Sequence, residues 1–391
     1  MKRFVSMATM ATMATMALAL LAVSIPASAE LSGRAVKIGV MYPLTGKGAS
    51  WGENAQIGIQ LAAEEINAAG GIGGVPIKLV EYDYQAKESE GINIINKLAT
   101  RDEVLAVLGP CFSSVVEVTY PLLERLKMPV ISYCSAKPGL SALSEWGFRN
   151  SLTSDKQLAP VVKAWKAEYG IESAVIIHDL EDAVSKAEGA KVLPMLFEKE
   201  GIEVKEVLTY RTEDTDFSAQ ITKAKSLNPD GIALGSCYQQ AAGIVKEARR
   251  QGMEQPVIGG ACAGSPGYIE LGGEQAEGSY MSTAAWMDDP RPAVQEFVEK
   301  VFAKNGGQQF PYSAPRGYDT MYITAQCMED LGVTNKKDDL ASDRDKIRQC
   351  WSELKDYDGV SGMTTMNEVG DGAGGMRVLK VMDGKYVDVS Q

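Results

Sequence analysis

The sequence predicts an α/β protein of two lobes, each built on a doubly wound parallel sheet and joined to the other by hinge strands. Its 391 residues are too many for one average domain and suit two domains of ordinary size. Apolar strand-like runs alternate with amphipathic helix-like runs along most of the chain, which is typical of parallel sheets covered on both faces. With 45% hydrophobic and 23% charged residues, compact folding is expected throughout.

The first lobe is expected to begin with a strand over the apolar run 36–41, buried on both faces. A crossover helix is predicted over 51–68, because Ala55, Ile59 and Ala62 recur at helical spacing and polar residues fill the opposite face. Further elements are expected as strands over 77–82, 104–108 and 130–133 and a helix over 114–126.

The second lobe repeats this alternation. Its expected strands are 174–177, 231–234 and 257–258, and its expected helices are 188–199 and 241–250. No low-complexity linker separates the two series, which favours short hinges that the chain crosses more than once. The predicted boundaries are 30–150 and 281–357 for the first lobe, and 151–280 and 358–391 for the second. One continuous large sheet is the alternative.

Residues 1–29 have the pattern of a secretory signal peptide, with Lys2 and Arg3 before an apolar run and Ala27-Ser28-Ala29 as cleavage site. A membrane anchor is the alternative, but the run is shorter than the roughly 20 apolar residues that a spanning helix needs. No cysteine follows the cleavage site before Cys111, which argues against lipid attachment. The mature chain is expected in the periplasm without direct membrane insertion.

The surface charge is strongly acidic. The formal net charge is −12, and removal of the two basic residues of the signal peptide makes it −14. Such a surface repels nucleic acid, so no nucleic-acid partner is expected. No later apolar stretch is long enough to cross a bilayer, so any connection with a membrane must run through a partner protein.

The glycine-rich run 70–74 invites comparison with a phosphate-binding loop, which follows a strand and opens a helix. Here the run follows a predicted helix and precedes a predicted strand. A helix C-cap and turn is therefore the better interpretation, and no nucleotide cofactor is expected.

Catalytic and metal-binding patterns are absent from the sequence. It has one histidine, His178, and neither a Ser-x-x-Lys motif nor a metal-ligand cluster of recognisable spacing. His178 ends a predicted strand, where it could line a cleft, although a lone histidine is more often structural. We therefore expect that the chain is not an enzyme and that it binds neither a metal ion nor a cofactor.

The segment 109–114, Gly-Pro-Cys-Phe-Ser-Ser, ends one predicted strand and opens the next helix. Ligands of open α/β sheets bind at such strand ends. Ser113 and Ser114 can offer hydroxyl groups, while the backbone N–H groups of a helix start attract an anion. An ordinary helix cap without a ligand is the alternative.

Five runs together carry a resemblance to a known family. They are Val-Lys-Ile-Gly-Val at 36–40 with Pro-Leu-Thr-Gly at 43–46, the run at 66–74, the segment 109–114, Pro-Val-Ile-Ser at 129–132, and Gly-Tyr-Asp at 317–319. In this order and spacing the chain resembles the leucine/isoleucine/valine-binding protein family, the type I periplasmic binding proteins of branched-chain amino-acid ABC importers. The resemblance covers nearly the whole mature chain.

The resemblance implies ligand contacts in the first lobe. Trp51 matches an aromatic residue that covers the ligand, and Ser113 matches the serine that binds its carboxylate. In the turn after the fourth strand, Cys134, Ser135 and Ala136 match a further contact region. Ala136 replaces a threonine of the family, and the hydroxyl of Ser135 is a candidate substitute.

The second lobe departs further from the family. Tyr238 matches, but Ala183 stands near a family tyrosine, and Ala261 near the acid that pairs with the ligand's ammonium. Asp182, or its neighbours at 179 and 181, could replace that acid, or could belong to a solvated turn. A buried ammonium without a counter-charge is costly, so a carboxylate lacking the α-amino group is expected to bind at least as well as leucine.

The six cysteines of an exported chain could form disulfides. Cys327 and Cys350 bracket one helix-like stretch, as a staple or as two reduced core thiols. If the sheets are parallel, the strand ends near Cys111 and Cys134 could be neighbours, as could those near residues 237 and 262.

The resemblance implies a solute-binding component of an ABC importer that captures a small carboxylate, either an amino acid or an aromatic or branched organic acid. Its partners would be the importer's membrane permease subunits, and a monomer is expected. A periplasmic ligand-sensing partner of a chemoreceptor or kinase is the alternative. An exported hydrolase is a further rival, which the missing base beside any cleft serine argues against.

Overall fold

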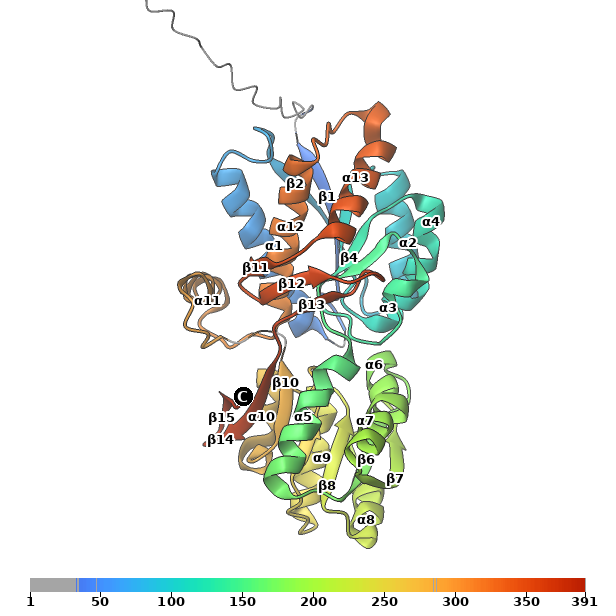
Figure 1. Cartoon of the computed structure of the whole chain (residues 1–391), viewed down its shortest axis with the longest axis vertical. Coiled ribbons are helices and arrows are strands. Elements are labelled where there is room, and N and C mark those ends of the chain that lie inside the picture. The colour runs from blue at the N-terminus through green and yellow to red at the C-terminus, as the bar shows by residue number, and fades with distance from the viewer. Residues whose placement is uncertain (1–32, 34, 47, 284, 286, 391) are drawn as a thin grey trace, which may run out of the picture.

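The computed structural model describes residues 33, 35–46, 48–283, 285 and 287–390, so the predicted signal peptide lies outside the described residues. The chain forms two lobes arranged one above the other along the longest axis of the molecule (Figure 1). Each lobe has its own central sheet with helices packed against it. The alternative of one continuous sheet is wrong.

The first lobe contains a five-stranded parallel sheet in the order β2-β1-β3-β4-β5. Its strands are β1 (Val36–Tyr42), β2 (Ile77–Asp83), β3 (Ala106–Leu108), β4 (Val130–Ser132) and β5 (Gly147–Arg149). The crossovers are α1 (Ala49–Ala68), α2 (Glu88–Thr100), α3 (Ser113–Thr119) with η1 (Tyr120–Leu122) and α4 (Leu123–Leu126), and η2 (Ser141–Leu143). The central strands β3 and β4 are buried along their length, as expected for apolar runs covered on both faces.

The second lobe contains a seven-stranded sheet in the order β15-β14-β10-β9-β8-β6-β7. Its strands are β6 (Ser173–Asp179), β7 (Glu203–Tyr210), β8 (Gly231–Gly235), β9 (Val257–Gly259), β10 (Tyr280–Thr283), β14 (Arg377–Met382) and β15 (Lys385–Asp388). The segments between them are α5 (Ser154–Tyr169), α6 (Ala183–Ala187), η3 (Glu188–Val192), α7 (Leu193–Glu200), α8 (Ser218–Leu227), α9 (Tyr238–Arg250), α10 (Pro266–Gly272) and η4 (Gly273–Ala276). Strands β6 to β10 pair in parallel, and β14 and β15 add an antiparallel edge.

The chain between β10 and β14 completes the first lobe. It consists of α11 (Pro292–Asn305), α12 (Ser313–Asp330), η5 (Lys337–Asp339), α13 (Leu340–Glu353) and a three-stranded antiparallel sheet of β11 (Tyr357–Gly359), β12 (Gly362–Met366) and β13 (Gly372–Gly374). Helix α12 packs along α1 in the first lobe. None of the helices within the described ranges is long and apolar enough to span a bilayer.

Two predicted lobe boundaries need correction. Strand β10 pairs with β9 and β14, so the chain leaves the second lobe after Thr283 and not at residue 281. Strands β11 to β13 belong with the first lobe, because the Asp319 carboxylate of α12 accepts hydrogen bonds from the backbone N–H groups of Val360 and Ser361. The sheet of β11 to β13 has its hydrogen-bond partners in the first lobe. The chain therefore returns to the second lobe at β14 and not at residue 358.

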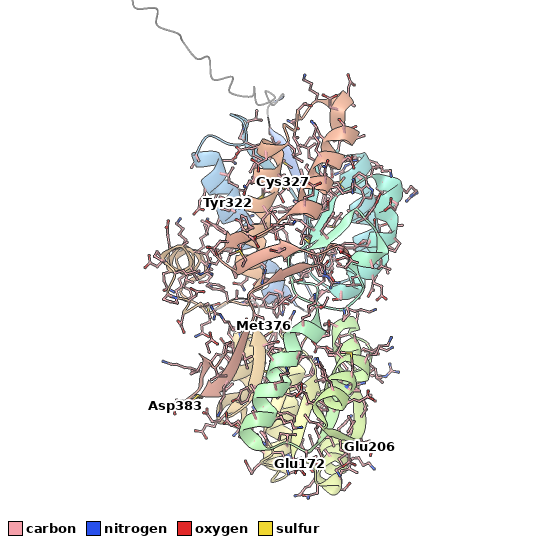
Figure 2. The ribbon with its side chains drawn as sticks, in the orientation of Figure 1. Glu172, Glu206, Tyr322, Cys327, Met376 and Asp383 are labelled. Carbon is pink, nitrogen blue, oxygen red and sulfur yellow. A yellow bond between two sulfur atoms is a disulfide. The ribbon has the colours of Figure 1, made fainter. Side chains whose placement is uncertain are left out.

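The described chain therefore crosses between the lobes three times: after β5, after β10, and between β13 and β14. Met376, labelled in Figure 2, lies at the third crossing, where the upper and lower lobes meet.

Beside the first crossing, the guanidinium of Arg149 is fully buried and pairs with Asp371 at 2.5 Å. Arg149 also donates to the carbonyl of Lys137 at 2.7 Å. This ion pair joins the end of β5 to the segment before β13, two segments that are 222 residues apart in sequence.

Candidate functional site

The carboxyl ends of β1, β3 and β4 face those of β6, β8 and β9 across the junction of the lobes, and two adjoining cavities lie there. The wider one has a volume of about 230 Å³ and the narrower one about 30 Å³. Both are lined by Trp51, Phe112, Asp182 and Cys237, two residues from each lobe. This is where ligands of open α/β sheets bind.

Trp51 lies in the first turn of α1 and is almost fully buried. Its ring meets that of Tyr312 edge to face, with 4.9 Å between the ring centroids. Ser313 donates its hydroxyl to the Trp51 carbonyl at 2.9 Å, and Tyr312 donates its hydroxyl to the Cys134 carbonyl at 3.0 Å. The two rings thus form a fixed aromatic wall, of which sequence reasoning found Trp51 and missed Tyr312.

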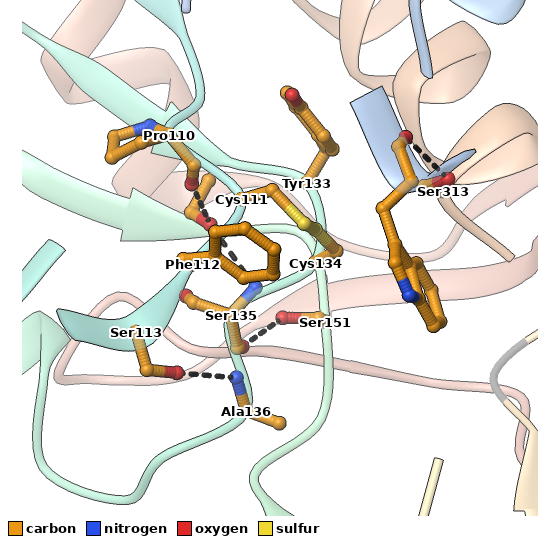
Figure 3. The surroundings of a disulfide bond; sticks show 12 residues. Pro110, Cys111, Phe112, Ser113, Tyr133, Cys134, Ser135, Ala136, Ser151 and Ser313 are labelled. Atoms are coloured by element: carbon orange, nitrogen blue, oxygen red, sulfur yellow. Dashed lines mark hydrogen bonds between the residues drawn. A yellow bond between two sulfur atoms is a disulfide. The ribbon is translucent and has the colours of Figure 1, made fainter. Parts of the chain in front are cut away.

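Ser113 opens α3 directly after the turn at Gly109. Gly109 has a φ of +101°, and a Cβ there would lie 2.5 Å from the Met41 carbonyl oxygen, so only glycine fits this turn. Figure 3 shows the Ser113 hydroxyl against Ala136, whose backbone N–H donates to it at 3.3 Å; the N–H of Lys137 also donates to it, at 3.2 Å. Since the oxygen accepts both bonds, the hydroxyl proton is free to donate to a ligand.

Replacing Ser113 with alanine is expected to weaken carboxylate binding by about 1–3 kcal/mol, the usual cost of leaving a buried charged group without one partner. Isothermal titration calorimetry of the purified protein measures this change. A melting temperature close to that of the unchanged protein would show that the turn at Ala136 survives. Unchanged affinity would mean that the serine only holds this turn.

The turn after β4 divides the three residues predicted there. Cys134 and Ala136 line the narrow cavity, but Ser135 is not among its lining residues. The Ser135 hydroxyl is buried without a hydrogen-bond partner in the described part of the chain, and its carbonyl accepts from Ser151 at 2.6 Å (Figure 3). The hypothesis that Ser135 replaces the threonine of the family is therefore not supported by its position. Ser114 lines the wider cavity.

Three disulfides pair all six cysteines: Cys111–Cys134, Cys237–Cys262 and Cys327–Cys350. All three are pairings that the sequence left open as hypotheses, and the structure contains each of them. The first two join neighbouring strand ends, β3 to β4 in one lobe and β8 to β9 in the other, and all four of their cysteines line the narrow cavity. The third joins α12 to α13 away from the cleft.

The three acids predicted after β6 differ in what they contact. Both carboxylate oxygens of Asp179 have partners: one accepts from the N–H groups of Glu181 and Asp182 in the same loop, and the other accepts from the hydroxyl of Thr212 after β7. Glu181 is exposed and pairs with an arginine. Asp182 accepts the N–H of Ser185 at 2.8 Å as the N-cap of α6, and it lines both cavities.

Tyr238 and Ala261 come from the ends of β8 and β9. Tyr238 opens α9 and lines the wider cavity, where burial raises the pKa of its hydroxyl. Ala261 is buried in the same hydrophobic cluster as Trp51 and Tyr312 but does not line either cavity. The position at which the family's acid was expected thus holds a packed methyl group.

Glu188 is an acid in the cleft that sequence reasoning missed. It begins the π-helical turn η3, is 1% exposed, and lines the narrow cavity. Its Oε2 has no hydrogen-bond partner in the described ranges. Burial, with Asp182 nearby, raises the pKa of the Glu188 carboxyl well above its usual range. The sequence indicates it only as the first residue of the helix predicted over 188–199.

His178 is buried against Gly189, with its Nδ1 2.8 Å from the Asp179 carbonyl oxygen. It does not line the two cavities, which agrees with the structural interpretation. Among the residues that the structure places, no three His, Cys, Asp or Glu side chains gather in a way that could hold a metal ion.

A family model described as periplasmic binding protein matches residues 35–385, so the chain belongs to the periplasmic binding protein family. The Leu/Ile/Val-binding protein homolog 3 of Brucella melitensis is 26% identical over 359 residues, covering 90% of this chain and 93% of that protein. An amino acid binding protein of Pseudomonas aeruginosa is 30% identical over 334 residues, covering 78% and 80%.

A leucine binding protein of Thermotoga maritima has a solved structure that superposes with a TM-score of 0.82 at 28% identity, covering 91% of this chain and 98% of that one. The predicted type I fold and the resemblance to leucine/isoleucine/valine-binding proteins are both confirmed. The chain is thus a periplasmic binding protein of the branched-chain amino-acid transporter family, whose relatives are named as binding proteins.

Proposed function

We propose that the chain is the solute-binding component of an ABC importer, and that it captures a small carboxylate-bearing solute, an amino acid or an aromatic or branched organic acid. The observation that carries this proposal is the pair of cavities between the strand ends of both lobes, in a chain of this family. The site would act by binding alone, with no cofactor.

Binding follows from the two walls of the cleft. Trp51 and Tyr312 would cover the apolar body of the solute, and the free proton of the Ser113 hydroxyl would bind its carboxylate. The narrow cavity of about 30 Å³ has room for little more than one water molecule, so the solute enters when the lobes separate and is enclosed when they approach. The three crossings of the chain would serve as the hinge.

The closed arrangement would present surfaces of both lobes to the importer's membrane permease subunits. The protein would do this as a monomer in the periplasm, after removal of residues 1–29. The excess of acidic residues, 51 Asp and Glu against 39 Lys and Arg in the full chain, argues against nucleic acid as a partner.

Purified mature protein is expected to melt at a higher temperature in the presence of its solute, because a ligand that binds only the folded state stabilises that state. A thermal-shift screen of amino acids and of aromatic and aliphatic carboxylates, followed by calorimetry of each hit, measures this. A ligand at 100 times its Kd adds about 2.7 kcal/mol to the free energy of unfolding. Turnover of any bound solute would contradict a pure binding role.

Deleting the gene separates import from sensing. Loss of solute uptake with an intact response to the solute is the expected result. Intact uptake with a lost response would instead assign the chain to a chemoreceptor or kinase.

A further inference from the structure

The cleft carries opposite polar groups on its two walls. Ser113 of the first lobe offers a hydroxyl donor, and Glu188 of the second lobe offers a buried carboxyl, and both line the same narrow cavity. We propose that Glu188 binds a protonated amino group of the solute, so that the solute is a small amino acid held by its carboxylate to one lobe and by its ammonium to the other. This inference rests on the proposed function and names its ligand class.

Glu188 is positioned by its local backbone. The π-helical turn η3 interrupts the helix between α6 and α7, and such turns are frequent at functional sites. Its carboxyl group packs against Gly260 at the end of β9, where a Cβ would lie 2.5 Å from the nearer carboxyl oxygen. Any other residue at 260 would push the carboxyl group away from its present place, so the glycine and the π-helical turn together hold the acid at the cavity.

One oxygen of the Glu188 carboxyl group has no hydrogen-bond partner among the described residues. This oxygen, Oε2, is buried, while the lysines of the same helical segment, Lys186 and Lys191, are exposed. The ionisable side chains that interact electrostatically with the carboxyl group are acidic or phenolic: Asp182 and Tyr210 of its own lobe, and Tyr312 across the cleft. Leaving such a group unpaired is costly, and an ammonium would supply both the missing charge and N–H donors.

The other acids of the second lobe are less suited to this role. Both oxygens of Asp179 already accept hydrogen bonds, from Glu181 and from Thr212, and Asp182 already caps α6 with one oxygen. The sequence predicts that a carboxylate without an α-amino group binds at least as well as leucine, on the premise that the second lobe has lost its acid at Ala261. Glu188 removes that premise, because it brings an acid to the cleft from a different element.

The test uses four matched pairs of probes, each an L-amino acid and the same acid without its amino group. They are leucine with 4-methylpentanoate, phenylalanine with 3-phenylpropanoate, alanine with propanoate, and glutamate with pentanedioate. In whichever pair binds to the mature protein, calorimetry is expected to show that the amino acid binds at least tenfold more tightly than the acid without the amino group. The variant Glu188→Gln keeps the shape of the side chain and is expected to reduce this preference at least tenfold, with the affinity for the acid lacking the amino group changed less than threefold.

Three further variants serve as controls. Glu198→Gln removes an exposed carboxylate on the following helix α7 and is expected to change neither affinity. Glu188→Asp keeps the charge on a shorter side chain and is expected to retain part of the preference, which guards against a Gln variant that folds poorly. Asp182→Asn removes the other carboxylate of the narrow cavity, and loss of the preference in this variant alone would overturn the assignment to Glu188.

The remaining outcomes separate the two proposals. If carboxylates bind but the amino group brings no preference, the inference is wrong and the proposed function stands. Equal weakening of both members of a pair by Glu188→Gln would show a purely structural role and also overturn the inference. If no carboxylate of the panel binds, the proposed function itself fails.

Discussion

Replacing Arg149 with methionine is expected to lower the free energy of unfolding by about 3–5 kcal/mol, the usual cost of removing one member of a buried ion pair. The guanidinium is fully buried, and it lies 2.5 Å from Asp371. Without it, the carboxylate of Asp371 stays buried with no counter-charge, and the Lys137 carbonyl loses a donor. Urea unfolding followed by tryptophan fluorescence measures the change.

Two controls accompany this variant. Arg250→Met breaks an exposed ion pair with Glu247 on α9 and is expected to change stability little, because solvent screens such pairs. The double variant Arg149→Met with Asp371→Leu removes both charges together and is expected to recover part of the loss. A loss below about 1 kcal/mol in Arg149→Met would mean that water or local rearrangement compensates the carboxylate.

Removing any one disulfide by replacing both cysteines with alanine is expected to cost about 3 kcal/mol of stability. The three bonds close loops of nearly equal length, with sequence separations of 23, 25 and 23 residues, so the loss of chain entropy in the unfolded state is nearly the same for each. Melting of the oxidised protein and of each double variant tests this.

The three disulfides should differ in their effect on binding. Removal of Cys111–Cys134 or Cys237–Cys262 frees a strand end at the cavity and is expected to weaken solute binding as well. Removal of Cys327–Cys350, which lies away from the cleft, is the matched control and should leave the affinity unchanged. An equal loss of affinity in all three variants would show that the effect follows general stability and not the cavity wall.

The two-lobed α/β class could be predicted from the sequence because the patterns of its main strands and helices are local. The apolar run that became β1 and the amphipathic stretch that became α1 are each determined by their own residues. The glycine run 70–74 follows the end of α1 and precedes β2, as its order in the chain predicted. Pairing of the cysteines at neighbouring strand ends could be raised only as a hypothesis, because the sequence does not show the distance between two strand ends.

The site could be predicted only in part, because its second wall depends on tertiary packing. Whether Ser135 or Ala136 faces the cavity is decided by the twist of one turn, which no pattern encodes. Tyr312 follows no strand end, and Glu188 reaches the cavity because a π-helical turn and Gly260 place it there. The lobe boundary near residue 358 failed for the same reason, since the partners of β11 to β13 come from remote parts of the chain.

Each wall of the cleft contains a disulfide, and this determines how the three crossings of the chain affect the affinity for the solute. Because each half of the site is covalently held, closure is mainly a change in the relative position of two preformed halves. The apparent Kd then equals the intrinsic Kd divided by the fraction of molecules in the closed arrangement. A substitution near Met376 that lowers this fraction about tenfold raises the apparent Kd about tenfold without touching the solute. The solute concentration at which half of the protein is occupied can thus change while the specificity for the solute stays the same.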